Sequence, residues 1–186
     1  MRVSGNRPGD DEIRACLEAV PDPEIPVISV IDLGIVRWWR WQDSPALARS
    51  TSQEPALQRS APQSPVLVVA VTPTYCGCPA NDMIAADIRA ALLAHGIAEV
   101  RIERQLTPPW TTDWLTEKGR ARLRQFGIAP PVGLAAGGAS TIPRVVSCPH
   151  CGADDTALVS RFGSTPCKAQ YRCRQCLEPF DYFKCY

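Results

Sequence analysis

The sequence predicts an α+β protein in which a domain of helices and strands is followed by a small C-terminal cysteine ribbon. Between residues 10 and 130, segments with helical spacing of apolar residues are interspersed with short segments typical of strands. In the last roughly 40 residues, two Cys-x-x-Cys pairs favour a small fold held together by a metal ion. We therefore expect a domain over 10–130, a linker over 131–144 and a ribbon over 145–186.

Composition argues against several classes of function. The 186 residues include 20 Lys and Arg against 19 Asp and Glu, so the positive charge excess of a nucleic-acid-binding protein is missing. No apolar run is long enough to cross a bilayer, and the N-terminus lacks the apolar core of a signal peptide, which predicts a cytoplasmic protein. Nine cysteines in such a protein favour metal binding or thiol chemistry over disulfide bonds.

The first expected element is a helix over 10–20, with acidic residues in its first turn and two prolines after its end. Its apolar face consists of Ile13, Leu17 and Val20. The loop that follows contains the acidic motifs "DPEIP", with Asp22 and Glu24, and "IDLG", with Asp32. Because Asp beside Pro forms turns readily, loop structure alone is a sufficient reason for these residues.

Three strands are expected in the same domain. The first runs from about Ile35 to Trp41, and its three tryptophans indicate a partly covered sheet face, with a partner-binding surface as the less favoured interpretation. The segment "VLVVAV", residues 66–71, predicts a central strand covered on both faces, and "EVRIERQL" supplies the third strand. Residues 42–65, rich in Ser, Pro, Gln and Ala, are predicted to be a flexible insertion.

The stretch "TPTYCGCPANDMIAADIRAALLAHG", Thr72 to Gly96, contains the next helix. Pro79 is a favoured first helical residue, which makes Cys78 the predicted N-cap. The predicted buried stripe is Met83, Ile84, Ile88, Ala91 and Leu92. Gly96 is expected to end the helix.

The segment "TTDWLTEKGRARLRQF" predicts one helix or two short ones, because Gly119 weakens a continuous helix. Its basic residues are interpreted as a solvated face rather than a docking patch for an acidic partner: Lys118, Arg120, Arg122 and Arg124. The Pro-, Gly- and Ala-rich segment over 129–143 is interpreted as a linker.

The C-terminal cysteines have the spacing of a metal site. "CPHCG" contains Cys148 and Cys151, and "CRQC", about 20 residues further on, contains Cys173 and Cys176. This pattern predicts a tetrahedral four-thiolate Zn²⁺ site that stabilises a unit too small to fold securely by its core alone. An iron site for electron transfer has the same ligands and stays open as an alternative.

Three further residues lie near this set. His150 is interpreted as a bystander, because four cysteines already complete the ligand shell. Cys167 is expected to be a packed thiol rather than a replacement ligand. The pattern assigns no role to Cys185.

The thiols of the "YCGC" motif are the candidates for chemistry. A thiol at a helix N-terminus is stabilised as thiolate by the helix dipole and nearby amide groups, so Cys78 is a candidate reactive or metal-binding sulfur. Cys76 lies two residues away, and Gly77 relaxes the turn between them, so both sulfurs could face one ion or one persulfide-bearing partner. The alternative is that one or both are small buried apolar residues.

Three segments in this order, "DPEIPVISVIDLGIV", "VTPTYCGCPANDMIAADI" and "PPWTTDWLTEKGRARL", resemble the metal-sulfur cluster biosynthesis domain family. That family includes SufT-like proteins and eukaryotic cytosolic iron-sulfur targeting factors. The resemblance covers about 10–130 apart from 42–65. A ribbon ending in "CLEPFDYFKCY" narrows it to the PaaD family, whose members belong to the multicomponent phenylacetyl-CoA 1,2-epoxidase system.

The resemblance implies a small mixed-sheet metal-sulfur cluster assembly domain and a role in supplying or maturing iron or iron-sulfur centres. It places the reactive cysteine of the family at Cys78 and acidic motif positions at Asp22, Glu24 and Asp32, near that thiol. Cys76 departs from the family pattern, in which a small residue without a thiol, usually Ser, is expected.

The leading hypothesis is therefore an accessory protein that is not itself an enzyme. Its Cys78 thiolate, with Cys76, Asp22 and Glu24, transiently holds iron or a cluster, while the zinc ribbon supplies a docking surface. The resemblance implies as partners the di-iron oxygenase, the reductase with its iron-sulfur cluster and flavin, or iron-sulfur assembly proteins. The alternative is a stable structural subunit that assembles with the oxygenase. A thiol-dependent enzyme ranks last, because no base is evident beside a nucleophile.

Overall fold

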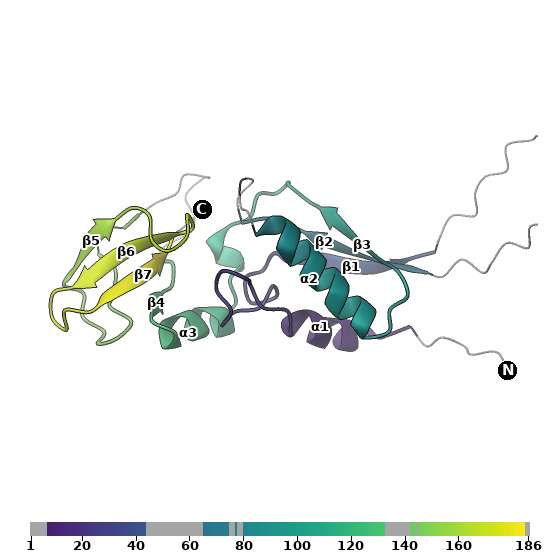
Figure 1. Cartoon of the computed structure of the whole chain (residues 1–186), viewed down its shortest axis with the longest axis horizontal. Helices are drawn as coiled ribbons and strands as arrows, with labels where there is room; N and C mark the ends of the chain where they lie inside the picture. Colours follow the sequence, from purple (N-terminus) through teal and green to yellow (C-terminus); the bar gives the residue numbers. More distant parts are fainter. Residues whose placement is uncertain are drawn as a thin grey trace, which may run out of the picture.

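A computed structural model of the chain describes residues 7–43, 65–74, 77, 80–132, 142–143 and 145–184. The described residues form helices and two sheets, so the predicted α+β class is confirmed. Figure 1 shows the three-stranded and the four-stranded sheet toward opposite ends of an elongated molecule, with the helix α3 (Glu117–Gln125) near the place where they meet.

The first sheet is mixed. Its strands are β1 (Val36–Gln42), β2 (Val66–Val71) and β3 (Val100–Arg104), in the order β1-β2-β3. β1 runs antiparallel to β2, whereas β3 runs parallel to β2 because the helix α2 (Asn81–Ala94) makes the crossover between them. Every residue of β2 is buried, so the central position predicted from its uniformly apolar sequence is confirmed.

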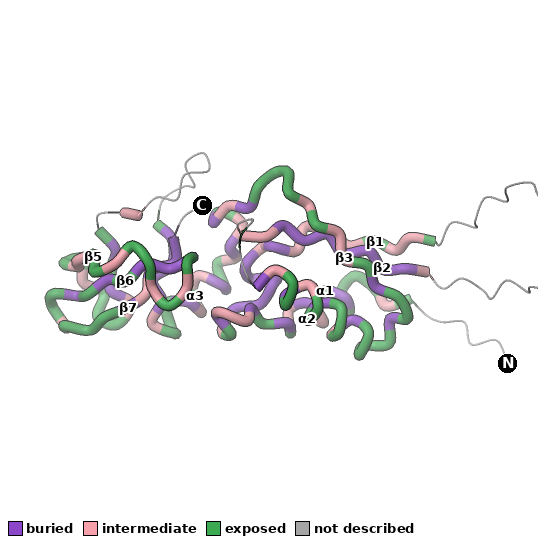
Figure 2. Tube along the Cα trace, turned by 45° about the horizontal axis from the view of Figure 1, so that its top comes forward, coloured by how far each residue is buried: buried purple, intermediate pink, exposed green. Residues whose placement is uncertain are grey.

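The helices α1 (Asp10–Glu18) and α2 pack on one face of this sheet, and the buried residues between them appear purple in Figure 2. One apolar core joins both helices to alternate residues of β2: Ile13, Leu17, Ile84, Ile88, Leu92, Leu67, Val69 and Val71. The prediction that Met83 belongs to the buried stripe was wrong, since its side chain is exposed. Burial repeats every four residues from Ile84, and Met83 lies about 100° around the helix from that stripe.

The tryptophans of β1 lie on both faces of the strand. Trp39 and Trp41 pack against the core of the domain, and Trp39 Nε1 donates a hydrogen bond to Asp10 Oδ1 at 2.9 Å. Trp38, which pairs with a residue on the other face of β2, donates through Nε1 to Gln105 Oε1 at 3.0 Å. Their interpretation as packing residues on a partly covered sheet is confirmed for Trp39 and Trp41.

The segment after β3 forms two short elements, the 3₁₀ turn η1 (Thr112–Trp114) and α3. Of the two predicted arrangements, one helix or two short ones, the second is therefore correct. Thr116 caps α3, because its Oγ1 accepts a hydrogen bond from the amide of Gly119 at 2.9 Å. A Cβ at Gly119 would lie 3.0 Å from the carbonyl oxygen of Asp32. The glycine therefore allows the first turn of α3 to approach the "IDLG" loop closely.

The prediction of a solvated basic face was wrong for Arg120 and Arg122. Arg122 Nη1 donates to Asp32 Oδ2 at 2.7 Å, and Arg120 donates to the carbonyl oxygens of Thr112 and Pro131 at 2.8 and 3.0 Å. These guanidinium groups bind parts of the chain outside their own helix, which the local charge pattern does not show.

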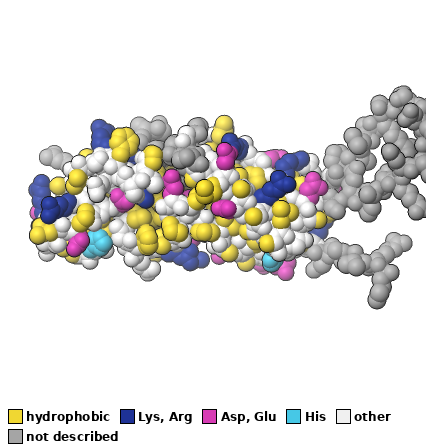
Figure 3. Space-filling view, viewed as in Figure 1, with side chains coloured by type: hydrophobic (Ala, Val, Ile, Leu, Met, Phe, Trp, Pro, Cys, Tyr) yellow, Lys and Arg dark blue, Asp and Glu magenta, His cyan; other side chains and the backbone are white. Residues whose placement is uncertain are grey.

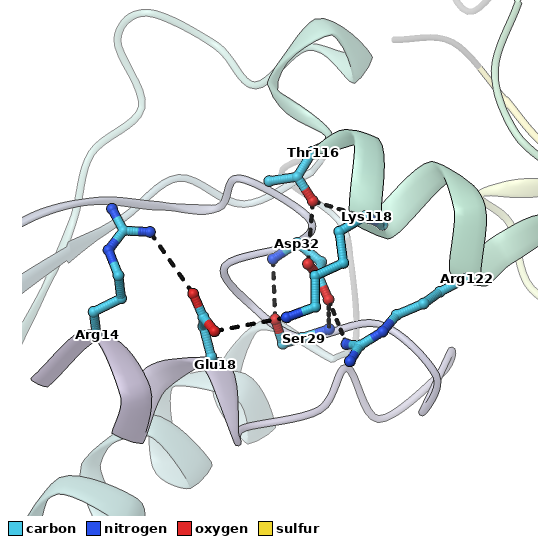
Figure 4. A network of polar contacts seen from close by, with 8 residues as sticks. Arg14, Glu18, Ser29, Asp32, Thr116, Lys118 and Arg122 are labelled. Carbon is cyan, nitrogen blue, oxygen red and sulfur yellow. Dashed lines mark hydrogen bonds and ion pairs between the residues drawn. The ribbon is translucent and has the colours of Figure 1, made fainter. Parts of the chain in front are cut away.

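Asp32 is the centre of the polar network in Figure 4. Its carboxylate accepts hydrogen bonds from the amide of Ser29 at 3.3 Å and from Thr116 Oγ1 at 3.1 Å, in addition to the one from Arg122. The amide of Asp32 donates to Ser29 Oγ at 3.0 Å. These contacts tie the loop to α3, which gives Asp32 a structural role.

The second sheet has the order β4-β7-β6-β5. Its strands are β4 (Ile128–Ala129), β5 (Thr156–Ser160), β6 (Lys168–Cys173) and β7 (Pro179–Phe183). Tyr171, Phe180 and Tyr182 form its aromatic core, with ring centroids 5.8 Å apart in each of the two pairs that Tyr171 makes. Because β4 pairs with β7, the sheet of the ribbon includes Ile128 and Ala129, which precede the linker predicted over 131–144. Ala129 is buried, so the Pro-, Gly- and Ala-rich segment over 129–143 begins inside a strand.

The ribbon packs directly on the first domain. Phe183 and Cys167 of the ribbon belong to the main apolar core, and the Phe183 ring meets the Trp110 ring edge-on with centroids 6.1 Å apart. Over the face shown in Figure 3, side chains of Lys, Arg, Asp and Glu are interspersed with hydrophobic ones, in keeping with the net charge of +1.

The predicted insertion over 42–65 and the linker over 131–144 fall mostly outside the described residues. Among the helices that the structure describes, none has the length and apolar character needed to cross a membrane.

Candidate functional site

Four cysteine thiols converge in the ribbon. Cys148 and Cys151 lie in the turn before β5, Cys173 ends β6, and Cys176 lies in the turn before β7. Their sulfur atoms all lie within 4.8 Å of one another, with 3.7 Å between Cys148 and Cys176 and 3.6 Å between Cys151 and Cys173. Four thiolates about 2.3 Å from a tetrahedrally bound zinc ion would be separated by about 3.8 Å. The sulfur positions therefore fit a single zinc ion.

Backbone geometry positions both cysteine pairs. The residue after the second cysteine of each pair has a left-handed conformation, with φ of +78° at Gly152 and +66° at Leu177. In the second turn the amide of Cys176 donates to Cys173 Sγ at 3.4 Å. This hydrogen bond stabilises the thiolate and is the main cause that lowers the pKa of Cys173 to about 7.

His150 lies outside the thiol cluster, as expected of a bystander. It is exposed, and its imidazole Cε1 lies 3.0 Å from the place where a Cβ of Gly127 would be. The six cysteines that the structure describes are all free thiols, in agreement with the expectation of metal or thiol chemistry rather than disulfides.

A second candidate site is a cavity of about 30 Å³ where the ribbon meets the first domain. Its polar lining includes Asp22, Glu24, Thr72, Thr74, Asn81, Arg104 and Cys167. Its apolar lining includes Ile25, Leu33, Ile35, Val71, Ile84 and Phe183. A volume of this size holds one or two water-sized groups, which is room for a single ion.

The topology of the chain explains why these residues meet. Thr72 follows β2 directly, Arg104 ends β3, and Asn81 begins α2, the helix that connects these two parallel strands. The carboxyl ends of parallel strands and the start of their connecting helix lie at the same edge of a sheet, where binding residues of such folds gather. The "DPEIP" loop and the ribbon complete the cavity at that edge.

Asp22 has a structural role beside its place in the cavity. Its Oδ1 accepts hydrogen bonds from the amides of Glu24 at 2.9 Å and Ile25 at 2.7 Å, which closes the turn of the "DPEIP" loop. Burial raises the pKa of its carboxyl group, while the two amide hydrogen bonds act in the opposite direction.

Cys167 is buried directly before β6, so its interpretation as a packed thiol is confirmed. Its sulfur lies 2.9 Å from Thr165 Oγ1 and donates to Glu24 Oε2 at 3.7 Å. Burial raises the pKa of this thiol to about 11, so the thiol carries its proton at neutral pH. The sequence did not indicate that Cys167 lies beside Glu24, because 143 residues separate them.

The predicted N-cap at Cys78 was wrong. The helix α2 begins at Asn81 with Ala80 at the N-cap position, because the first helical hydrogen bond joins the amide of Ile84 to the carbonyl of Ala80 at 2.8 Å. Cys76 and Cys78 lie outside the described residues, as does Cys185.

The residues on either side of this segment, Thr74 and Asn81, line the cavity.

Sequence reasoning missed Thr72 as well as the position of Cys167. Thr72 is 1% exposed and lines the cavity at the end of a strand recognised from its sequence. The place of Thr72 directly after a central parallel strand could have indicated it, since residues that follow such strands often face a binding site.

The ribbon and its thiol cluster define a metal-binding α+β protein, and comparison with known proteins agrees. The family model described as the PaaD zinc beta ribbon domain matches residues 136–184. A protein of Escherichia coli (strain K12), named as the D subunit of a "Putative 1,2-phenylacetyl-CoA epoxidase", is 44% identical over 174 residues, which cover 94% of this chain and 92% of that protein. The chain therefore belongs to the PaaD family of phenylacetyl-CoA epoxidase subunits.

Two solved structures are also similar. A domain of unknown function, DUF59, from Bacillus anthracis is 22% identical with a TM-score of 0.44, and the match covers 61% of this chain and 89% of that chain. Rv1466 from Mycobacterium tuberculosis, described as associated with Fe-S complex assembly and repair, is 29% identical with a TM-score of 0.35 over 67% and 93%. With TM-scores this low, neither superposition bears on function.

Proposed function

We propose that the chain is an accessory maturation factor for phenylacetyl-CoA epoxidase, which supplies or assembles iron or iron-sulfur centres through the Cys78 thiol and does not catalyse the epoxidation itself. Its clients are the oxygenase or reductase component, directly or through iron-sulfur assembly proteins. The Escherichia coli relative, whose name assigns it to the epoxidase, supports the choice of system.

One observation carries the proposal. Thr74 and Asn81, which precede and follow the Cys76 and Cys78 motif in the sequence, line a small cavity together with Asp22 and Glu24. Thiolate sulfur and carboxylate oxygen are both ligands of divalent transition metals, and a cavity of about 30 Å³ has room for such an ion.

The ribbon has a different task in this proposal. Four thiolates already complete a tetrahedral shell, so zinc bound by Cys148, Cys151, Cys173 and Cys176 has no open position for a transferred ion. Zinc there stabilises the ribbon, whereas the transferred iron or cluster is cargo of the Cys78 site.

The test measures iron and acid-labile sulfide in oxygenase and reductase components purified from cells with this chain, without it, or with the Cys78→Ser variant. We expect one component to lose iron or sulfide both without the chain and with Cys78→Ser. The matched control is Cys16→Ser, because Cys16 lies in α1 and is not among the residues that line the cavity. The control should restore full metal content.

The competing function is that of a structural subunit assembled with the oxygenase. It predicts full metal content in both components in every background, together with stoichiometric co-purification that tolerates Cys78→Ser. That result would rule out the maturation proposal and support the structural subunit instead.

A further inference from the structure

A buried hydroxyl of a residue that lines the cavity is unpaired within the part of the chain that the structure describes. Thr72 is 1% exposed and lines this cavity, and its Oγ1 has no hydrogen-bond partner among the described residues. The backbone of Thr72 is fixed, because its amide donates to the carbonyl of Ile35 at 2.8 Å. Since buried hydroxyl groups are normally hydrogen-bonded, this hydroxyl is available to a polar group that binds in the cavity.

Two potential metal ligands from different parts of the fold meet in the same cavity. Glu24 Oε2 of the "DPEIP" loop and Cys167 Sγ of the ribbon lie 3.7 Å apart. Sulfur and oxygen ligands of one tetrahedral ion, about 2.3 and 2.1 Å from it, are separated by about 3.6 Å. The two atoms therefore already have the spacing of ligands that share an ion.

We propose that Cys167 and Glu24 bind a ferrous ion in this cavity, with the Thr72 hydroxyl holding a water molecule on the ion. The inference rests on the proposed function and extends it, because the ribbon then supplies a ligand to the iron site. As the iron-sulfur bond forms, the Cys167 thiol releases its proton to solvent, and no electron is transferred.

The ligand chemistry selects the class of metal. A soft sulfur beside a hard carboxylate oxygen favours Fe²⁺, Co²⁺ or Zn²⁺ over Mg²⁺ and Ca²⁺, which prefer oxygen alone. The site is separate from the ribbon cluster, since Cys167 is not one of its four convergent cysteines. Cobalt is a suitable probe, because a Co²⁺-thiolate bond absorbs in the near ultraviolet.

The experiment titrates Co²⁺ into the full chain with its ribbon already loaded with zinc, and follows the cobalt-thiolate absorption and the zinc content. We expect one equivalent of Co²⁺ to bind beyond the zinc. Cys167→Ser should weaken binding at least tenfold and reduce the absorption. Thr72→Val, of nearly the same shape, should weaken binding about threefold.

Glu24→Gln keeps the proposal testable where Cys167→Ser fails to fold. Glu24 is half-buried and its amide replacement is conservative, so we expect normal zinc content with about tenfold weaker Co²⁺ binding. Cys16→Ser is the matched thiol control and should bind Co²⁺ as the unmodified chain does. Unchanged binding and absorption in folded Cys167→Ser, or no Co²⁺ bound beyond the zinc by the unmodified chain, would overturn the proposal.

Failure of this inference and failure of the proposed function are distinguishable. If Co²⁺ binding depends on Cys167 while Cys78→Ser still gives fully loaded epoxidase components, the iron site is supported and the maturation role of Cys78 is ruled out. If Cys78→Ser prevents iron loading of the epoxidase components while Cys167→Ser binds Co²⁺ normally, the maturation role is supported and the Cys167 site is ruled out.

Discussion

Leu177 has a left-handed backbone, with φ of +66°, at the place in the second cysteine turn that Gly152 occupies in the first. Such a conformation brings the Cβ of an ordinary residue close to a neighbouring carbonyl oxygen, at a free-energy cost of roughly 1–2 kcal/mol. The Leu177 side chain is largely exposed, so few contacts offset this cost.

Replacing Leu177 with glycine is therefore expected to stabilise the ribbon. The free energy of strain that is removed exceeds the cost of the extra conformational entropy that glycine gives the unfolded chain. The free energy of unfolding should therefore rise by about 0.5–1 kcal/mol. Since metal binding is coupled to folding in small metal-binding units, the gain should appear as a two- to fivefold tighter apparent zinc affinity in chelator competition. Gly152→Ala is the reciprocal control: a Cβ there meets no neighbour within 4 Å, so backbone strain alone should weaken zinc binding. Equal or weaker affinity in Leu177→Gly would contradict the argument.

The Cys167 thiol predicts a pH dependence of stability. Its pKa is raised from 9.0 to about 11 by burial, so between these values the unfolded chain releases a proton that the folded chain retains. The contribution of this thiol to the free energy of unfolding is fully present below pH 9 and falls by about 1.4 kcal/mol per pH unit up to pH 11. Denaturant unfolding of the zinc-loaded chain at pH 8 and pH 10 should therefore show a loss roughly 1 kcal/mol larger than in Cys167→Ala. An equal loss in both chains would show that this thiol does not retain its proton.

At the scale of elements, the packing of α3 against the "IDLG" loop depends on Asp32. Asp32→Ala leaves the amide of Ser29 and the guanidinium of Arg122 without their carboxylate, so we expect the free energy of unfolding to fall by about 2–3 kcal/mol. Glu18, shown beside Asp32 in Figure 4, is the matched control. Its ion pairs with Arg14 and Lys118 are exposed and 3.8 and 3.7 Å long, so Glu18→Ala should cost at most about 0.5 kcal/mol. Equal effects in denaturant unfolding would contradict a central role for Asp32.

The sequence alone predicted those elements whose burial depends on residues close to them in the chain. The strand over 66–71 was recognised because a uniformly apolar segment needs cover on both faces, and it is indeed central. Arg120 and Arg122 were misassigned because their partners come from a loop and from residues beyond the helix. Met83 was misassigned because a stripe predicted from apolarity includes residues at its edge.

The candidate site shows the same limit. Cys148, Cys151, Cys173 and Cys176 were selected by spacing alone, since each short loop must bring two sulfurs to one ion. Cys167 and Thr72 have no such local signal, because their place in the cavity depends on how β2, the "DPEIP" loop and the ribbon pack together.

At the scale of the whole molecule, the ribbon has an apolar core of its own and also contributes residues to the core of the first domain. β4 joins its sheet from the first domain, and Phe183 and Cys167 fill the core of that domain. A cavity lined by residues of both parts exists only while they are packed together. A zinc ion bound by the four ribbon cysteines would then also control the geometry of a site that contains none of its ligands.

Removal of zinc from the ribbon should therefore change the environment of tryptophan side chains in the first domain. All five tryptophans lie between residues 38 and 114, none of them in the ribbon, and Trp110 meets the Phe183 ring of the ribbon at 6.1 Å. When a chelator removes zinc, the ribbon loses its fold and Phe183 leaves Trp110, so tryptophan fluorescence should shift in step with zinc release. Trp110→Phe keeps an aromatic ring at the contact and should remove most of the shift. Complete loss of zinc with unchanged fluorescence would mean that the ribbon and the first domain are independent, because an unfolded ribbon cannot keep Phe183 against Trp110.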